Sequence, residues 1–302
     1  MRNTLAIAFI LPIAANLGGC GDGHDTSPRT AARDVTVTFA AATADGPVHC
    51  AETLPDIGVG PAPTLRLDDF RFYVSEVTLL TGDGTEVPVV LTDDGVWQSQ
   101  GVALLDFEDG CAGGTPQTND SIHGSAELPA GTAVEGLCFT LGVPFALNHL
   151  DPVTQPSPLN ASGMFWNWQG GYKFLRIDAV GDPDNRAVGF NVHLGSTGCT
   201  SAGATTPPGT ECRHPNRPRV CLSPFDPDQD RVVARLDRLL EDTDVTVNTP
   251  DTAPGCMSAN ADPECIAILP KLGLDFVYDD GVNPPVVYPA AEPQRFFVRA
   301  GS

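Results

Sequence analysis

Apolar and polar residues alternate along much of the chain after residue 33. Such alternation places every second side chain on the same face, which is the pattern of a β-strand with one buried side. A glycine-containing turn at 82–84 predicts a hairpin over 72–92. The clearest alternating runs, each of which predicts a strand, are 34–43, 65–81, 136–144, 173–180, 188–195 and 231–236.

Helical patterns are rare in comparison. Only residues 235–243 and 264–273 could form short helices, and the 31 glycines and 28 prolines disfavour long ones. The sequence therefore predicts an all-β fold, an antiparallel β-sandwich with long disulfide-tied loops and one or two short helices. No linker separates two sets of strands, so we expect residues 34–302 to form a single β-sandwich domain.

Residues 1–19 have the pattern of a signal peptide. Arg2 precedes an apolar stretch that is too short to span a bilayer as a mature helix. Residues 17–20 (LGGC) resemble the bacterial lipobox, in which Cys20 is acylated after cleavage. The alternative is an ordinary secretory signal cleaved near residues 14–15. We favour the lipoprotein, because two small residues precede the cysteine.

The residues after the lipobox suggest a location for the mature protein. The polar stretch 20–33 is typical of a tether between a lipid anchor and a folded domain. We therefore expect the protein in the bacterial periplasm or at the cell surface, held to the membrane only through Cys20. The net charge of −21 predicts repulsion of nucleic acids and of anionic lipid headgroups, so neither is an expected partner.

Nine cysteines are a large number for a chain of this length, and eight of them follow Cys20. An even number of cysteines in an exported protein predicts up to four disulfides. The chain has no CxxC pair, so a zinc site is the weaker interpretation. The bridges that loop position favours are Cys256–Cys265 and one pair among Cys199, Cys212 and Cys221.

The stretch MFWNWQGGY, residues 164–172, concentrates aromatic side chains in a chain that is poor in them. In a strand, Met164, Trp166 and Trp168 would share one face. Core packing is the simpler explanation, because each aromatic ring buries a large apolar area. The glycine pair that follows, Gly170-Gly171, predicts a bulge or a close approach of another backbone segment.

Histidines are also scarce, and two of them have an informative context. A lone histidine is more often structural than a metal ligand, but His193 alternates with apolar neighbours near the core, where its ring needs a hydrogen-bond partner or a metal. A simple hairpin at 181–185 would place His193 opposite residues 172–173. Trp168 would then lie roughly 13 Å away along the strand. A contact between them requires a bend at the glycine pair or a second strand folding over.

Five blocks of the sequence occur in an order that resembles a known family. The five blocks are DFRFYVSEVTLL (69–80), VALLDFEDGC (102–111), LGVPFALNHLD (141–151), MFWNWQGGYKFLRID (164–178) and HLGSTGC (193–199). With these blocks the chain resembles the MbnP-type copper-binding proteins, which are cysteine-rich partners of MauG-like di-haem enzymes. The resemblance extends from about residue 35 to residue 277, whereas the loops at 201–211 and 278–295 fit no pattern.

The resemblance implies that the di-haem partner oxidises a tryptophan to kynurenine, which then helps histidines to bind copper. Opening the indole ring creates an amine and a carbonyl, donor atoms that indole lacks. By position in the shared blocks, the modified residue is Trp166 or Trp168, with Trp168 favoured beside the glycine pair. His149 and His193 are the implied histidine ligands, and a thioether such as Met164 would favour Cu(I).

Two other classes of function remain open at this point. An enzyme in its own right is disfavoured, because the sequence has no nucleophile elbow, zinc-protease or phosphate-loop motif. An extracytoplasmic carbohydrate- or ligand-binding module is the alternative, with Trp166, Trp168 and Tyr172 as a stacking platform. The two hypotheses differ in whether His149 or His193 lies next to a tryptophan ring.

Overall fold

A computed structural model describes residues 30–60, 63–111 and 117–301. The expected signal peptide, Cys20 and residues 20–29 of the expected tether lie outside the described residues. The strands are β1 (Thr30–Ala42), β2 (Thr53–Pro55), β3 (Thr64–Thr81), β4 (Glu86–Leu91), β5 (Gln98–Ser99), β6 (Val102–Asp106), β7 (Ser121–Pro129), β8 (Val134–Leu141), β9 (Phe165–Asn167), β10 (Gly171–Tyr172), β11 (Leu175–Gly181), β12 (Val188–Leu194), β13 (Arg219–Leu222), β14 (Asp230–Arg235), β15 (Gly255–Cys256), β16 (Phe276–Tyr278), β17 (Val286–Tyr288) and β18 (Phe297–Gly301).

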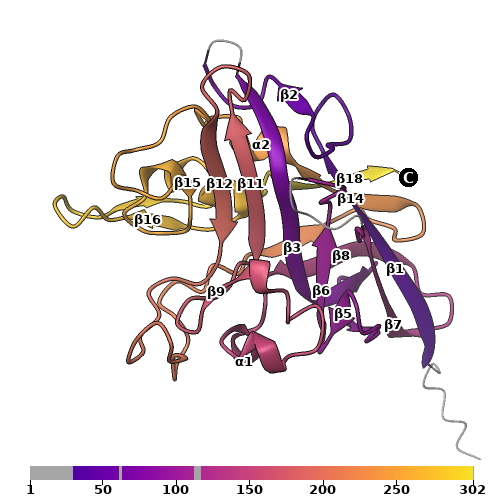
Figure 1. The fold of residues 1–302 in the computed structure, drawn as a ribbon. Coiled ribbons are helices and arrows are strands. Elements are labelled where there is room, and N and C mark those ends of the chain that lie inside the picture. The colour runs from indigo at the N-terminus through magenta and orange to yellow at the C-terminus, as the bar shows by residue number, and fades with distance from the viewer. Residues whose placement is uncertain (1–29, 61–62, 112–116, 302) are drawn as a thin grey trace, which may run out of the picture.

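The predicted all-β class is confirmed. Fourteen strands form one curled sheet, in which β15-β12-β11-β3-β4-β7-β1-β14-β18 are successive neighbours (Figure 1). Its pairings are antiparallel except β1 with β14 and β12 with β15, which are parallel. The sheet also begins earlier than the sequence predicts, because residues 30–33 pair with residues 126–129 of β7. These four residues therefore belong to the domain and not to a tether.

The helices are short, as predicted, but one of the two expected α-helices does not form. The segment 235–243 contains α2, whereas 264–273 forms two 3₁₀ turns in place of an α-helix. Pro270 interrupts that segment, because proline has no N–H to continue a helix and its ring clashes with the preceding turn. The helices are α1 (Phe145–Asn148) and α2 (Leu236–Leu240), with 3₁₀ turns η1 (Pro152–Thr154), η2 (Ser162–Met164), η3 (Pro263–Ile266) and η4 (Leu269–Leu272). None of the described helices is long and apolar enough to cross a membrane.

Strand β3 is the centre of the fold. Its first part pairs with β11, and its second part pairs with β8 and β4. Within the second part, Glu76 has a left-handed backbone with φ of 53°, and the pairing with β8 shifts register there. The bend lets the sheet close over an aromatic core, in which the ring centroids of Phe39 lie 6.0 Å from Phe72 and 5.7 Å from Phe139.

Four disulfides cross-link the described residues. The expected Cys256–Cys265 bridge is confirmed, and Cys199 pairs with Cys212 among the three candidates. Cys221 instead pairs with Cys138, because these two residues lie directly opposite each other on β13 and β8. The remaining described bridge is Cys50–Cys111.

Candidate metal centre

The chain bends sharply at the glycine pair. Strands β9 and β10 form a small hairpin, which lies with α1 at one end of β11 and β12 (Figure 1). Gly171 has φ of +77°, and a Cβ there would lie 2.5 Å from both the carbonyl oxygen and Oδ1 of Asn148. The Tyr172 amide donates to Asn148 Oδ1 at 2.8 Å. The predicted bulge and close backbone approach are therefore present.

His193 lies near the end of β12, opposite Arg176 of β11 and not opposite residues 172–173. The register differs because the loop at 182–187 is centred later than the predicted turn. The expected separation along a straight strand therefore does not apply. Instead, the β9–β10 hairpin brings the tryptophan segment back over the end of β12.

The His193 ring is buried, with 5% of the residue exposed, and it has one polar contact. Its Nε2 lies 2.5 Å from Asp178 Oδ1, whereas its Nδ1 is buried and has no hydrogen-bond partner among the described residues. Burial lowers the pKa of His193, although the hydrogen bond with Asp178 acts in the opposite direction. A neutral ring that donates from Nε2 keeps a lone pair on Nδ1, which suits a metal ion.

Trp166 is the aromatic neighbour of His193. The two ring centroids are 6.4 Å apart and the planes are tilted by 49°. The indole packs over the backbone at Gly195, where a Cβ would lie only 2.4 Å from the indole Cζ3. Trp166 is half-buried, so one part of its ring reaches the surface. The first tryptophan of the pair, and not the second, therefore lies beside a histidine ring.

A hollow of about 300 Å³ is lined by Trp166 and also by Met257. The Ser258 hydroxyl holds the methionine segment beside β12 by donating to the His193 carbonyl at 2.8 Å. Within its own loop, the Met257 amide donates to Asp262 at 3.2 Å. Burial and the neighbouring Glu264 raise the pKa of Asp262 to about 7. Trp166 and Met257 thus line one hollow, and Ser258, the residue after Met257, is hydrogen-bonded to the carbonyl of the histidine that the indole contacts.

Met164, the thioether that the sequence singled out, lies elsewhere. It is fully buried in the apolar core, where it ends η2 and its carbonyl accepts the Lys173 amide at 2.7 Å. The shared face of Met164, Trp166 and Trp168 does not form, because β9 begins after Met164 and has only three residues. The sequence contained a signal for Met257. The chain has three methionines and one of them is the first residue, so Met257 is the remaining thioether besides Met164.

His149 and Trp168 form a separate arrangement. The His149 Nδ1 lies 3.1 Å from the Trp168 carbonyl oxygen, so Trp168 contributes its backbone to this contact. The His149 Nε2 lies 3.1 Å from the Asn148 side-chain nitrogen. Burial lowers the pKa of His149, and its neutral ring then donates through Nδ1 and accepts through Nε2. Both nitrogens are occupied, so neither is free for a metal.

Two sulfur atoms lie near His149 as well. The ligand atoms of His149, Cys199 and Cys212 all lie within 4.8 Å of one another, a spacing that could hold a metal ion. The two sulfurs are bonded to each other, however, and the thiolate is the form of cysteine that binds metals. In the disulfide-bonded protein this group is therefore a structural contact.

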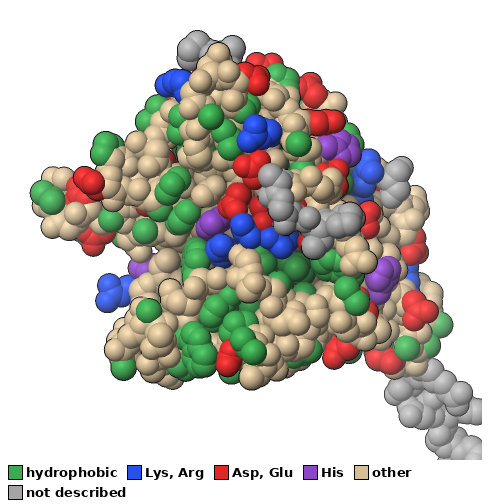
Figure 2. Space-filling view, in the orientation of Figure 1, with side chains coloured by type: hydrophobic (Ala, Val, Ile, Leu, Met, Phe, Trp, Pro, Cys, Tyr) green, Lys and Arg blue, Asp and Glu red, His purple; other side chains and the backbone are tan. Residues whose placement is uncertain are grey.

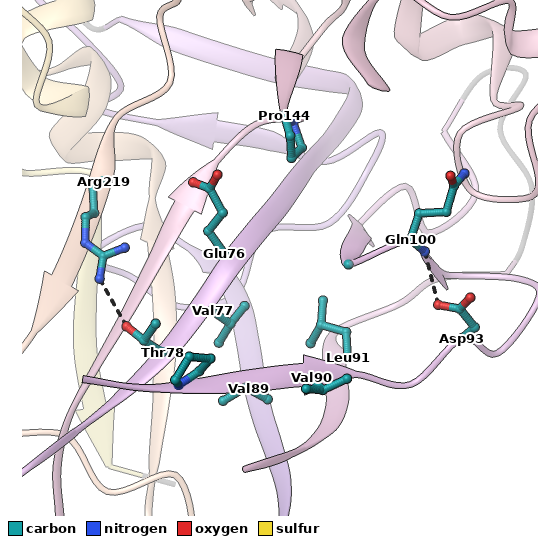
Figure 3. A pocket seen from close by; sticks show the side chains of 12 residues that line it. Glu76, Val77, Thr78, Val89, Val90, Leu91, Asp93, Gln100, Pro144 and Arg219 are labelled. Carbon is teal, nitrogen blue, oxygen red and sulfur yellow. Dashed lines mark hydrogen bonds between the residues drawn. The ribbon is translucent and has the colours of Figure 1, made fainter. Parts of the chain in front are cut away.

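A larger hollow of about 760 Å³ lies at β3 and β4 (Figure 3). Its lining includes Val77, Leu91 and the ion-pairing residue Arg219, whose guanidinium lies 3.1 Å from the Thr78 hydroxyl. None of its lining residues is aromatic.

Tyr172 is fully buried and its hydroxyl donates to the Leu159 carbonyl. It therefore cannot join the two tryptophans in an exposed stacking platform.

Comparison with known proteins agrees with this architecture. A family model described as MbnP matches residues 32–258. A solved structure of MbnP from Methylosinus trichosporium is 33% identical, has a TM-score of 0.72, and is matched over 90% of this chain and 99% of its own. A search of the curated proteins gives no match. The family match covers most of the chain, so the protein belongs to the MbnP family.

Proposed function

We propose that this protein is an exported copper-binding protein whose site lies between His193, Trp166 and Met257. We further propose that a MauG-like di-haem enzyme completes the site by oxidising Trp166 to kynurenine. The observation that carries the proposal is the buried Nδ1 of His193, which has no hydrogen-bond partner among the described residues and belongs to the ring next to Trp166. A buried polar atom without a partner costs free energy, and a bound metal would remove that cost.

The donor set fits copper better than harder metals. Imidazole nitrogen binds copper in both oxidation states, and a thioether selects Cu(I). Met257 lines the hollow beside Trp166, whereas the fully buried Met164 does not. His193 and Met257 are therefore the proposed protein ligands.

Oxidation of Trp166 would add donor atoms between the hollow and His193, because the indole borders both. The indole Cγ–Cδ1 bond breaks, oxygen is added to both carbons, and hydrolysis releases Cδ1 as formate. The product has an aryl amine and a ketone in place of a ring N–H that can only donate. The di-haem enzyme supplies the oxidising equivalents in this proposal, so the protein is a substrate and metal binder and not an enzyme. Trp168 is the less suitable target, because its known contact is through its backbone carbonyl.

The cellular location of the protein is also part of the proposal and rests on the sequence. We propose a lipid anchor at Cys20 and a periplasmic or cell-surface position. Disulfides are stable in such oxidising compartments, and the four described bridges are consistent with export. The carbohydrate-binding alternative is weakened by the burial of Tyr172, which removes one ring from the supposed platform.

The test is to produce the protein together with its di-haem partner as wild type, Trp166→Phe and Trp168→Phe. Tandem mass spectrometry locates a tryptophan that has lost one carbon and gained oxygen, and elemental analysis measures copper. We expect modification at Trp166 and copper in the wild type and in Trp168→Phe, but neither in Trp166→Phe. Modification of Trp168 alone, or equal copper in all three proteins, would contradict the proposed site.

A further inference from the structure

A row of charged side chains extends from His193 across β12, β11 and β3. Figure 2 shows basic and acidic side chains gathered near the middle of this face, beside a histidine. Pairing between the strands explains the row, because Arg176 lies opposite both His193 and Arg71, and Asp178 lies opposite Asp69. In order, the members are His193, Asp178, Arg176, Asp69, Arg71 and Glu108.

Asp178 divides its two oxygens between two partners. Oδ2 accepts from Arg176 Nε at 3.0 Å and from Arg176 Nη2 at 2.5 Å. Oδ1 is thereby left to His193 Nε2, at 2.5 Å. Two N–H groups of one planar guanidinium anchor Oδ2, and the contact of Oδ1 with His193 then sets the orientation of the carboxylate. The position of Oδ1, and with it the orientation of the imidazole, is fixed in turn.

Arg176 is itself held from two sides. Its Nη1 lies 2.9 Å from Asp69 Oδ2, and the Asp69 carboxylate is 5% exposed and also pairs with Arg71. The same Nη1 donates to the Gly163 carbonyl at 3.2 Å, and Lys173 Nζ donates to that carbonyl at 3.0 Å. Gly163 is three residues before Trp166. One guanidinium therefore fixes both the partner of His193 and the segment that carries the indole.

We infer that Asp178 is a positioning residue, held by Arg176, that keeps His193 in the Nε2–H tautomer and directs the lone pair of Nδ1 toward the Trp166 side. The inference rests on the proposed function only where it concerns copper. Carboxylates that accept the second ring N–H of a metal-binding histidine orient the ring in this way, and their removal typically weakens metal binding by about 10–100-fold.

The tautomer can be measured without copper and without the di-haem enzyme. Long-range proton–nitrogen NMR spectra of the unmodified protein, labelled with ¹⁵N-histidine, distinguish a protonated Nε2 from a protonated Nδ1. We expect His193 to be Nε2–H in the wild type and a mixture of tautomers in Asp178→Leu. Asp178→Asn keeps an oxygen acceptor but can also turn its amide toward the ring, so we expect an intermediate result.

A second arginine–aspartate pair provides a matched control. Arg235 contacts Asp237 through Nε at 2.8 Å and Nη2 at 2.6 Å, with the same two-residue spacing and no histidine. The two side chains are 19% and 20% exposed, against 20% and 24% for Arg176 and Asp178. Asp237→Leu should therefore destabilise the fold to a similar degree and leave the His193 tautomer and copper affinity unchanged.

Copper binding gives the second measurement, on protein that carries the tryptophan modification. We expect Asp178→Leu to lower copper affinity about 10–100-fold while the modification still occurs. If Asp178→Leu does not fold, Asp178→Asn is measured in its place. A folded variant that keeps both the wild-type tautomer and the wild-type affinity would overturn the inference. If the tautomer changes but His193→Ala leaves copper binding intact, the positioning role stands and the proposed copper site fails.

Discussion

The two histidines of the candidate region are equally buried, at 5% exposure each, yet their surroundings differ. His149 has a partner on each ring nitrogen, whereas His193 has one on Nε2 and none on Nδ1. Each histidine also contacts one tryptophan, His149 through the backbone of Trp168 and His193 through the ring of Trp166. Burial alone therefore does not identify a candidate metal ligand. The two histidines differ in whether a ring nitrogen lacks a hydrogen-bond partner.

The largest expected effect separates these histidines directly. His193→Ala should lower copper affinity by more than about 100-fold, because losing a ligand exceeds the usual effect of losing a ligand's hydrogen-bond partner. His149→Ala should retain copper but lose about 1–3 kcal/mol of stability, since it leaves buried polar groups unpaired. Copper titration and urea unfolding of both variants measure the contrast. Copper loss in His149→Ala and not in His193→Ala would reverse the comparison.

Gly171 supports the His149 environment, because its backbone packs against Asn148, which contacts His149. Gly171→Ala should destabilise the fold by more than about 2 kcal/mol, because the left-handed backbone alone costs about 1–2 kcal/mol and the new Cβ would clash with Asn148. Gly189→Ala is the control, since a Cβ there meets nothing within 4 Å. Urea unfolding compares them, and equal stability of the two variants would exclude the proposed clash.

The two methionines should also behave differently. Met257→Leu keeps the volume but removes the sulfur that we propose as a copper ligand, so we expect Cu(I) affinity to fall about tenfold, on the order of 1.4 kcal/mol. Met164→Leu should cost less than about 1.5 kcal/mol of stability, as a volume-conserving core change, and leave copper binding unchanged. Competition with a Cu(I) chelator provides the measurement. Weaker binding in Met164→Leu alone would point to the core residue.

The smallest effect concerns Glu108, at the far end of the charged row that begins at His193. Burial and the neighbouring Asp69 raise its pKa to about 7, above the ordinary 4.5. The fold therefore favours the protonated carboxyl, and this contribution to stability falls as pH rises from about 4.5 through about 7. Glu108→Gln should lose less stability than the wild type between about pH 5 and pH 8. If urea unfolding shows that both proteins lose the same free energy of unfolding over this pH range, the raised pKa is contradicted.

Much of the fold was predictable because alternation is a local property. The strands 173–180 and 188–195 were expected within a few residues of β11 and β12. The glycine pair correctly predicted a bend with a close backbone contact. The helix expected at 264–273 failed at Pro270, where turn chemistry outweighs the apolar periodicity.

The candidate site was harder to predict, because it depends on contacts between distant segments. A turn misplaced by little more than a residue put His193 opposite the wrong partner. Only the folded chain distinguishes a buried Met164 from Met257 at the hollow. The pairing of Arg176 with both Asp178 and Asp69 likewise requires the register of three strands.

Trp166, His193 and Met257 come from separate parts of the chain, and only the folded structure brings Trp166 beside both of the others. A copper ion bound there would be a ligand of the native state alone. Thermodynamic linkage then makes the melting temperature depend on free copper concentration, with a gain of about 2.7 kcal/mol at a hundredfold excess over Kd. Copper would thus lengthen the lifetime of the folded protein against proteases, independently of any role in transport or storage.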